Sequence, residues 1–282
     1  MQACPFGSLL SGIKNRRFCT IFIRLEILSM KRSSSQLKAL ARTSLSGQWG
    51  LPIGASLLAS LGSLIPSMII TGLLDPYSTV SIITCQILVY VVSILISLLQ
   101  TGYIRLLLHM NRRETCSLKD LIYPYTAHPD RFLVVSLILV TAGAVLSLPF
   151  TILSYQETDL ATGATLSLIA LLVQSLTSII LALFFGLANY LLLDYEDMGA
   201  AQALKESCRL MKGNKGRYLY ITFSFIPLAL VSIFTCYIGL LWLTPYMSVT
   251  MAYFYMDVTG ELDNPKPPRQ PEPEAPRVED YY

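Results

Sequence analysis

The chain has 282 residues, of which 53% are hydrophobic and 14% charged, against about 25% charged residues in typical soluble domains. This composition, with a mean hydropathy of +0.55, excludes an ordinary soluble domain and indicates an all-α, polytopic integral membrane protein. The net charge of +3 says less than the placement of Lys and Arg, which lie in four blocks at residues 1–42, 105–131, 205–217 and 266–277.

The two ends of the chain differ from its middle. Residues 1–29 carry scattered basic residues and no long apolar core, so they are not typical of a signal peptide. Two interpretations stay open: translation starts at Met30, or residues 1–29 form a poorly ordered cytoplasmic extension. Residues 259–282 are rich in Pro and charge and are predicted to be a disordered tail. The predicted membrane domain is residues 30–258.

Apolar segments of this domain predict six membrane spans. Four lie at about residues 51–73, 82–104, 132–154 and 166–193. The uncharged run from Tyr218 to Met256 is about twice the roughly 20 residues that cross a bilayer, so it is predicted to form a hairpin of two spans. Pro245 is expected to begin the last helix. Only 14 residues then remain to Val258, so Leu240–Leu243 must contribute or the segment is re-entrant.

Small residues recur at every fourth position in two of the predicted spans. Such stripes allow helices to approach closely, so they are predicted to form helix contacts. The predicted packing residues are Ala55, Ala59, Ser63 and Ser67 in the first span, and Ser178, Ala182 and Gly186 in the fourth.

The segment from Met198 to Lys212 is predicted to form an amphipathic helix on the inner membrane surface. Its apolar face is expected at Ala201, Leu204, Cys208 and Met211. Five basic residues are predicted to contact anionic inner-leaflet lipids: Lys205, Arg209, Lys212, Lys215 and Arg217. The alternative is a solvated linker whose charges only fix the orientation.

The charge pattern also predicts the topology. The segments before the first, third and fifth spans are basic, whereas those after the first and third spans carry no Lys or Arg. The positive-inside rule therefore places the N-terminus in the cytoplasm, and six spans return the C-terminus there. A Leu-Lys pair precedes each odd-numbered span, at Leu37, Leu118 and Leu204, which suggests a repeated unit of surface helix and hairpin.

Residues suited to catalysis are not apparent in the sequence. No common catalytic motif occurs, and the six cysteines and two histidines show no metal-ligand spacing. His109 and His128 are interpreted as solvated loop residues. We expect no enzyme, no cofactor, no metal and no nucleic-acid partner. The expected partners are the lipid bilayer and an unidentified membrane protein.

Several stretches resemble a known family. They are LKALARTSLSGQWGLPIGASLLASL near the N-terminus and, later, AAQALKESCRLMKGNKGRYLYITFSFI, IGLLWLTPY and AYFYMDV. Together they resemble a bacterial membrane-protein family, the domain of unknown function numbered nine hundred and seventy-five, over Met30 to Val258. The resemblance implies a multi-pass protein of the bacterial cell membrane without an assigned activity. A more distant similarity is to the membrane portion, not the catalytic portion, of glycerophosphodiester phosphodiesterases.

Two functional hypotheses follow. The favoured one is a non-enzymatic scaffold that organises partners or lipids. The alternative is a transporter or permease component in which helices broken at Pro66, Pro149 and Pro227 shape a central cavity. A water-filled cavity at the membrane midplane, lined by Gln86, Gln174 and Asn189, would favour transport, whereas a solid core of small and aliphatic residues would favour the scaffold.

Overall fold

A computed structural model of the chain describes residues 32–73, 79–127, 129–156, 159–235 and 237–265. The described part contains helices and no strand, as predicted for an all-α bundle. Its elements in chain order are α2 (Ser34–Leu45), α3 (Gly50–Leu73), α4 (Thr79–Arg112), the 3₁₀ helix η1 (Leu118–Leu121), α5 (Tyr123–Thr126), α6 (Pro129–Gln156), α7 (Leu160–Phe185), α8 (Ala188–Asp194), α9 (Ala200–Met211), α10 (Lys215–Phe223), α11 (Ile226–Phe234) and α12 (Leu240–Val258).

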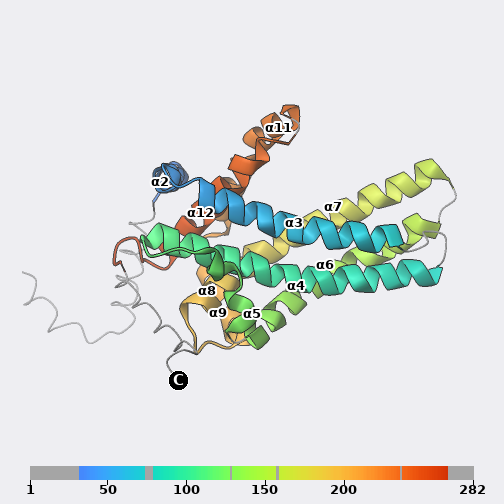
Figure 1. Cartoon of the computed structure of the whole chain (residues 1–282), viewed down its shortest axis with the longest axis horizontal. Helices are drawn as coiled ribbons and strands as arrows, with labels where there is room; N and C mark the ends of the chain where they lie inside the picture. The colour runs from blue at the N-terminus through green and yellow to red at the C-terminus, as the bar shows by residue number, and fades with distance from the viewer. Residues whose placement is uncertain (1–31, 74–78, 128, 157–158, 236, 266–282) are drawn as a thin grey trace, which may run out of the picture.

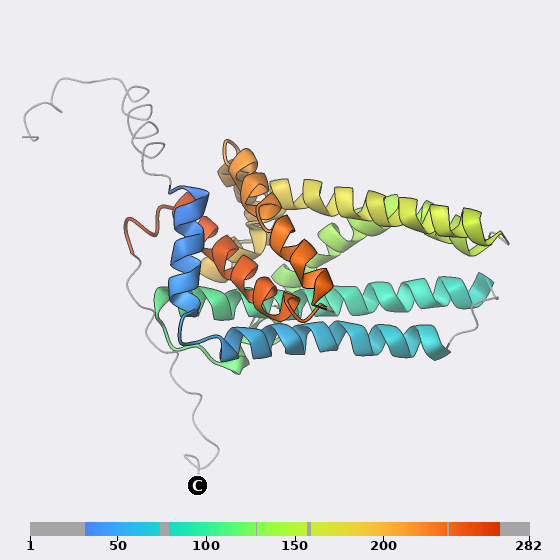
Figure 2. The same ribbon diagram turned by 90° about the horizontal axis from the view of Figure 1, so that it is seen from above.

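Two long hairpins make up most of the molecule. Helices α3 and α4 form one and α6 and α7 the other, and they run in roughly parallel directions in both views (Figures 1 and 2). The remaining helices gather at one end of these hairpins. This end, formed by α2, the C-terminal part of α4, η1, α5, α8, α9 and the start of α10, is called the charged end below.

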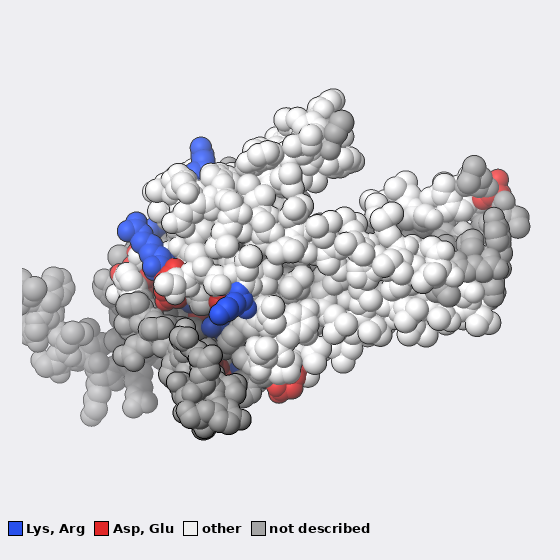
Figure 3. Space-filling view, viewed as in Figure 1, with Lys and Arg blue, Asp and Glu red and all other residues white. Residues whose placement is uncertain are grey.

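Charge divides the molecule along its long axis. Basic side chains gather at the charged end, the long middle is almost free of charge, and acidic side chains stand at the opposite tip, called the far end (Figure 3). Asp159 caps α7 there, accepting a hydrogen bond of 3.0 Å from the Thr162 amide. This distribution suits a bilayer-embedded middle with the basic end on one side.

Five helical segments of the described chain are long and apolar enough to cross a membrane: 50–73, 83–112, 129–154, 161–194 and 215–234. They correspond to the first five predicted spans. The fourth and fifth each combine two helices, α7 with α8 and α10 with α11. Helix α3 continues through Pro66 and α6 through Pro149, so the helix breaks expected at these two prolines do not occur. A break does occur next to Pro227, between α10 and α11.

Helix α12 differs from the sixth span predicted. It begins at Leu240 with Pro245 inside it, and it is not among the five segments that meet the length and hydropathy of a span. Every residue from Val249 to Asp257 is buried, so this half is a central helix enclosed by protein on all sides. Helices α2, α3 and α4 pack against it. Its end lies beside Arg32, so the two ends of the described chain meet at the charged end.

A short helical element precedes each hairpin: α2 before α3, η1 with α5 before α6, and α9 before α10. The buried residues of α2 are Leu37, Ala41 and Leu45, and those of α9 are Ala203, Ser207 and Met211. Both helices are followed by a glycine with φ of +88°, Gly47 and Gly213. The separation in sequence from Leu37 to Ala203 equals that from Gly47 to Gly213. In the structure Leu37 therefore corresponds to Ala203, one residue before Leu204, with which the Leu-Lys match paired it.

Candidate functional site: a membrane cavity above a closed charged end

A large cavity lies between the two hairpins. Its volume is about 1020 Å³, and its walls come from α4, α6, α7 and the start of α8. On α6 the lining runs from Leu139 to Ile152 and on α7 and α8 from Gln174 to Asn189. At about 1.5 Å per helical residue these stretches cover roughly 20 Å of the ~30 Å hydrocarbon core. We call this space the main cavity.

The polar groups of the main cavity are uncharged. Amides come from Gln86 on α4, Gln174 on α7 and Asn189 on α8. Hydroxyl groups of Ser93, Ser147 and Ser178 also line it, but each donates a hydrogen bond to a carbonyl of its own helix. The amides are therefore the groups best placed to bind something inside the cavity.

Local packing positions two of the amides. A Cβ atom at Gly143 on α6 would lie 2.9 Å from Gln174 Nε2, so the glycine leaves room for this side chain. Asn189 Oδ1 is buried and has no hydrogen-bond partner among the residues that the structure describes. An unpaired buried carbonyl oxygen in a membrane is costly, so this atom invites a donor from a ligand or from water.

A turn at Gly186 and Leu187 separates α7 from α8 and forms the inner wall of the main cavity. Ser207 of α9 holds this turn: it accepts a hydrogen bond of 3.2 Å from the Leu187 amide and donates one of 3.0 Å to the Phe184 carbonyl. A Cβ atom at Gly186 would lie 2.4 Å from the Ala182 carbonyl oxygen, which explains the glycine at this position. Backbone groups freed by the break are thus paired within the protein, as a membrane requires.

Below this turn lies a second cavity of about 220 Å³ that also touches Gly186. Its walls include Tyr103, Tyr190 and Tyr218, and Phe254 of α12. Tyr190 stacks on Tyr255, with ring centroids 5.0 Å apart. A layer of aromatic side chains therefore separates the main cavity from the charged end.

A buried ion cluster closes the charged end. Arg112, at the end of α4, lies 2.8 Å from Asp194 of α8 and 2.5 Å from Glu261, which follows α12. Tyr255 donates a hydrogen bond of 2.6 Å to the same Asp194 carboxylate. Exposure of the side chains is 9% for Arg112, 0% for Asp194 and 2% for Glu261. These four residues, the Arg112 cluster, tie α4, α8 and α12 together.

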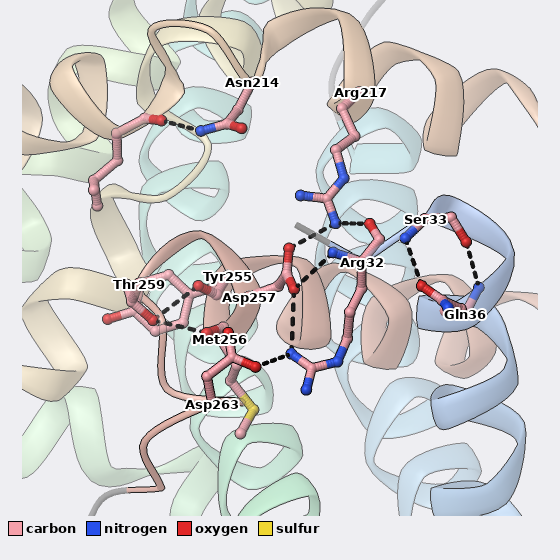
Figure 4. A network of polar contacts seen from close by, with 11 residues as sticks. Arg32, Ser33, Gln36, Asn214, Arg217, Tyr255, Met256, Asp257, Thr259 and Asp263 are labelled. Carbon is pink, nitrogen blue, oxygen red and sulfur yellow. Dashed lines mark hydrogen bonds and ion pairs between the residues drawn. The ribbon is translucent and has the colours of Figure 1, made fainter. Parts of the chain in front are cut away.

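Asp257 forms a second buried centre at the end of α12 (Figure 4). Its carboxylate lies 2.6 Å from Arg217 Nη2 of α10 and 3.5 Å from Arg32 Nη1 before α2. Arg32 also reaches Asp263, at 3.0 Å. The segment after α12 is therefore packed as far as Asp263. Within the stretch predicted as a tail from residue 259, Glu261 thus has a buried cationic partner in Arg112, and Asp263 has a partly exposed one in Arg32.

The two small-residue stripes lie in different surroundings. Ala55 and Ala59 are fully buried, whereas Ser63 and Ser67 are half-buried. Ser178, Ala182 and Gly186 line the main cavity instead of a tight helix contact. The spacing of small residues identified a face of α7, but that face borders a space instead of a neighbouring helix.

The predicted surface helix forms at Ala200–Met211, where it packs on α7 and α8. Its buried face is shifted by one residue from the expected one, so Ala201 is exposed and Leu204 and Cys208 are half-buried. Lys205, Arg209 and Lys212 are exposed, as lipid contact requires.

Two of the five predicted lipid-contact residues have protein partners. Lys215 Nζ lies 3.1 Å from the centre of the Phe184 ring. Arg217 is half-buried and paired with Asp257. The buried carboxylate of Asp257 requires a cation, which Arg217 supplies, and lipid contact by Lys215 and Arg217 stays a prediction.

His109 is not the solvated loop residue predicted, because it is only 9% exposed on α4. Its Nδ1 lies 3.4 Å from Asp120 and its Nε2 3.7 Å from Glu114. Arg105 approaches Asp120 to 3.3 Å as well. Burial alone raises the pKa of Asp120, but hydrogen bonds from His109 and the Ser117 amide and the nearby positive charges bring this pKa below its usual value. His128 lies outside the described residues.

Sequence reasoning missed the two ion clusters. No partner was predicted for Asp194, and Glu261 was placed in the tail. One signal was available: Asp194 and Asp257 each directly follow a long apolar run, where an ionisable group needs a partner.

The fold and the cavity define a polytopic helical membrane protein with a neutral cavity between its hairpins. A family model described as "Protein of unknown function (DUF975)" matches residues 30–261, and the chain belongs to this family. No curated protein and no solved structure matches the chain.

Proposed function

We propose that the protein is a transporter or permease component that binds an uncharged or amphipathic, hydrogen-bonding solute in the main cavity. The observation that carries the proposal is a cavity of about 1020 Å³ to which Gln86, Gln174 and Asn189 all contribute. Its size falls at the upper end of the usual range for small-molecule sites, roughly 300–1,000 Å³. A solid core at this position would instead have supported a scaffold.

The neutral lining supports the choice of solute class. A charged solute in a low-dielectric cavity needs a partner of opposite charge, and the described lining offers no Lys, Arg, Asp or Glu. Amide and hydroxyl groups suit a solute with hydroxyl or carbonyl groups, and the aliphatic walls suit an apolar part. The proposal includes no catalytic step.

The closure of the charged end indicates which conformational state of the proposed transporter the structure represents. The aromatic layer and the Arg112 cluster lie between the main cavity and the basic surface. If the basic end faces the cytoplasm, as the positive-inside rule predicts, the structure corresponds to a state closed on the cytoplasmic side. The family resemblance supports a location in the bacterial cell membrane as part of this proposal, and the distant similarity to glycerophosphodiester phosphodiesterases stays a prediction.

Thiol labelling tests whether the main cavity holds water. In a background without native cysteines, Ser178→Cys places a thiol on the cavity lining, and Leu176→Cys places one on an exposed apolar face of the same helix. A water-soluble thiol reagent is expected to modify the first variant much faster than the second. Equal, slow reaction at both positions would refute an aqueous path.

Flux through the protein is tested with glycerol as a neutral, hydrogen-bonding probe. Proteoliposomes are exposed to a glycerol gradient, and their swelling is followed by light scattering. Ala144→Phe fills the main cavity and is expected to slow entry, whereas Leu146→Phe, on an exposed position of α6, is not. Wild-type vesicles no faster than empty ones would exclude glycerol-type solutes, and an aqueous cavity would then have to serve a larger amphipathic solute.

The scaffold hypothesis has support of its own. Lys205, Arg209 and Lys212 are exposed on α9 at the charged end. Near an anionic leaflet each basic residue contributes about 1 kcal/mol. Crosslinking and co-purification from the native membrane tests this second proposal, because a stable partner recovered with Lys205, Arg209 and Lys212 intact and lost on their replacement by Gln would favour it.

A further inference from the structure

A separate polar cavity of about 530 Å³ lies at the charged end, away from the main cavity. Its walls come from the C-terminal half of α2, the segment that follows α4, and Tyr253 of α12. Hydroxyl and amide side chains make up much of the lining, together with Arg113, Glu114 and Cys116. We call it the polar cavity.

Arg113 occupies a backbone conformation that normally selects glycine. Helix α4 ends in a Schellman motif in which the Glu114 amide donates to the His109 carbonyl at 2.9 Å and the Arg113 amide donates to the Met110 carbonyl at 3.2 Å. Arg113 is the left-handed residue of this motif, with φ of +59°. An L side chain other than Asn or Asp rarely adopts this conformation without strain.

Other helices at the same end use glycine for the same purpose. Gly47 after α2, Gly213 after α9 and Gly260 after α12 all have positive φ. At Gly260 the bonding pattern is the same as at Arg113, because the Glu261 amide donates to the Met256 carbonyl at 2.8 Å. An arginine at the corresponding position of α4 therefore lacks a folding rationale, which points to a role for its guanidinium group.

That guanidinium is exposed and has no carboxylate within 4 Å among the residues that the structure describes. Glu114, its neighbour, instead faces His109 at 3.7 Å. A positive charge on the wall of a polar cavity, not neutralised by the described protein, is available to an anion.

Asn111 supplies a second unsatisfied group. It is 9% exposed and lines the polar cavity, and Ser44 Oγ donates a hydrogen bond of 3.3 Å to its Oδ1. Its Nδ2 is buried and has no partner in the described part of the chain. Hydroxyl protons of Thr43 and Ser46 are already given to backbone carbonyls. The Asn111 amide and the Arg113 guanidinium are therefore two donors on the cavity wall, beside the polar side chains of Gln48, Thr115 and Tyr253.

We propose that the polar cavity is an oxyanion-binding site for a phosphate group, held by Arg113 and Asn111. Such a group has several acceptor oxygens and a negative charge, and it complements two donors of which one is cationic. The phosphate can belong to a lipid headgroup at the membrane surface or to a free ion.

The test separates binding from folding, because the decisive variant is expected to fold better than the wild type. Thermal unfolding of the full-length protein in detergent is measured in sodium phosphate and in sodium chloride of equal ionic strength, and again with short-chain phosphatidic acid against short-chain phosphatidylcholine. A ligand that binds only the folded state raises its Tm. We expect phosphate or phosphatidic acid to raise the wild-type Tm by several degrees.

Arg113→Gly relieves the left-handed strain, so its Tm in chloride is expected to equal or exceed that of the wild type. It should lose the rise caused by the phosphate group. Lys119→Gln, which removes a positive charge on η1 outside the cavity lining, should keep that rise. A response to inorganic phosphate identifies a free ion as sufficient, and a response to phosphatidic acid alone identifies the lipid. No wild-type response to either probe, or an unchanged response in Arg113→Gly, overturns the proposal.

Discussion

Replacing Arg112 with Met should destabilise the protein strongly, because two buried carboxylates then lose their cation. Asp194 and Glu261 have side-chain exposures of 0% and 2%, and Arg112 is bonded to both at 2.5–2.9 Å. Breaking a buried pair by removing one partner typically costs about 3–5 kcal/mol, since the remaining charge stays desolvated. At about 2–4 °C per kcal/mol, the expected fall in Tm is roughly 6–20 °C.

The assay is thermal unfolding of purified protein in detergent, with a matched arginine as control. Arg209 pairs with Glu206 on α9, and its side chain is 76% exposed. Surface pairs of this kind contribute about 0–1 kcal/mol, so Arg209→Met should change the Tm little. Adding Asp194→Asn and Glu261→Gln to Arg112→Met should recover part of the loss. Equal Tm values for Arg112→Met and Arg209→Met would refute the assignment of the cluster as a stabilising centre.

Three further predictions use the same measurement. Ending the chain after Val258 removes Glu261 and should lower the Tm, whereas ending it after Pro265 should not. Equal Tm values for the two truncated proteins would contradict the packing of the segment between Val258 and Pro265. Gly102→Ala should be strongly destabilising, because a Cβ there would lie 2.2 Å from a backbone oxygen of η1. Gly54→Ala is the control: its Cβ meets nothing within 4 Å, so it should be neutral or stabilising by up to about 1 kcal/mol. Similar losses of stability in both variants would show that α4 and η1 do not pack so closely. The pKa of Asp120 lies below its usual value of 3.8, so the ionised carboxylate stabilises the fold above pH 3.8, and this stability is lost as the pH falls through the lowered pKa. In Asp120→Asn the Tm should therefore fall less than in the wild type between neutral and acidic pH. The same dependence of Tm on pH in both proteins would argue against the pairing.

The long hairpins were predictable from sequence because hydropathy and charge placement report directly on the membrane. A segment such as 132–154 has no satisfactory surroundings except lipid or protein, whatever the rest of the chain does. The predicted positions of the first five spans agree with helices of the structure for this reason.

The burial of α12 as a central helix was not predicted from the sequence. The run from Tyr218 to Met256 carries no charge, which suggested two spans, but α12 does not meet the hydropathy of a span and its residues Val249–Asp257 are enclosed by α2, α3 and α4. Helices in lipid and helices inside a protein both lack charged residues, so the absence of charge does not distinguish a central helix from a span. Asp257 at its end was the more informative residue, since a carboxylate after an apolar run needs cations from other segments.

The sequence did not predict the main cavity; a cavity was named only as the observation that would favour transport over the scaffold. Gln86, Gln174 and Asn189 were recognised as polar residues in spans, yet any one of them is equally suited to a hydrogen bond between helices. The three amides face one common space only if α4, α6 and α7 are rotated suitably about their axes. The small residues that set this rotation have the same spacing whether or not the amides face that space. Only the arrangement of both hairpins decides whether the amides pair with each other or face a space.

The short helix α8 connects the main cavity to the ion cluster at the charged end. Ser207 holds its N-terminal turn beside Gly186, which borders both the main and the second cavity, and Arg112 and Tyr255 hold Asp194 at its C-terminus. A path from the main cavity to the basic surface therefore cannot open without displacing α8, and displacing α8 breaks contacts at both of its ends. Because the Asp194 carboxylate is fully buried, it needs a new partner or water as soon as it leaves Arg112. If the protein transports a solute as proposed, its cycle has to supply that replacement, and the Arg112 cluster is then the energetic barrier to a state open at the charged end.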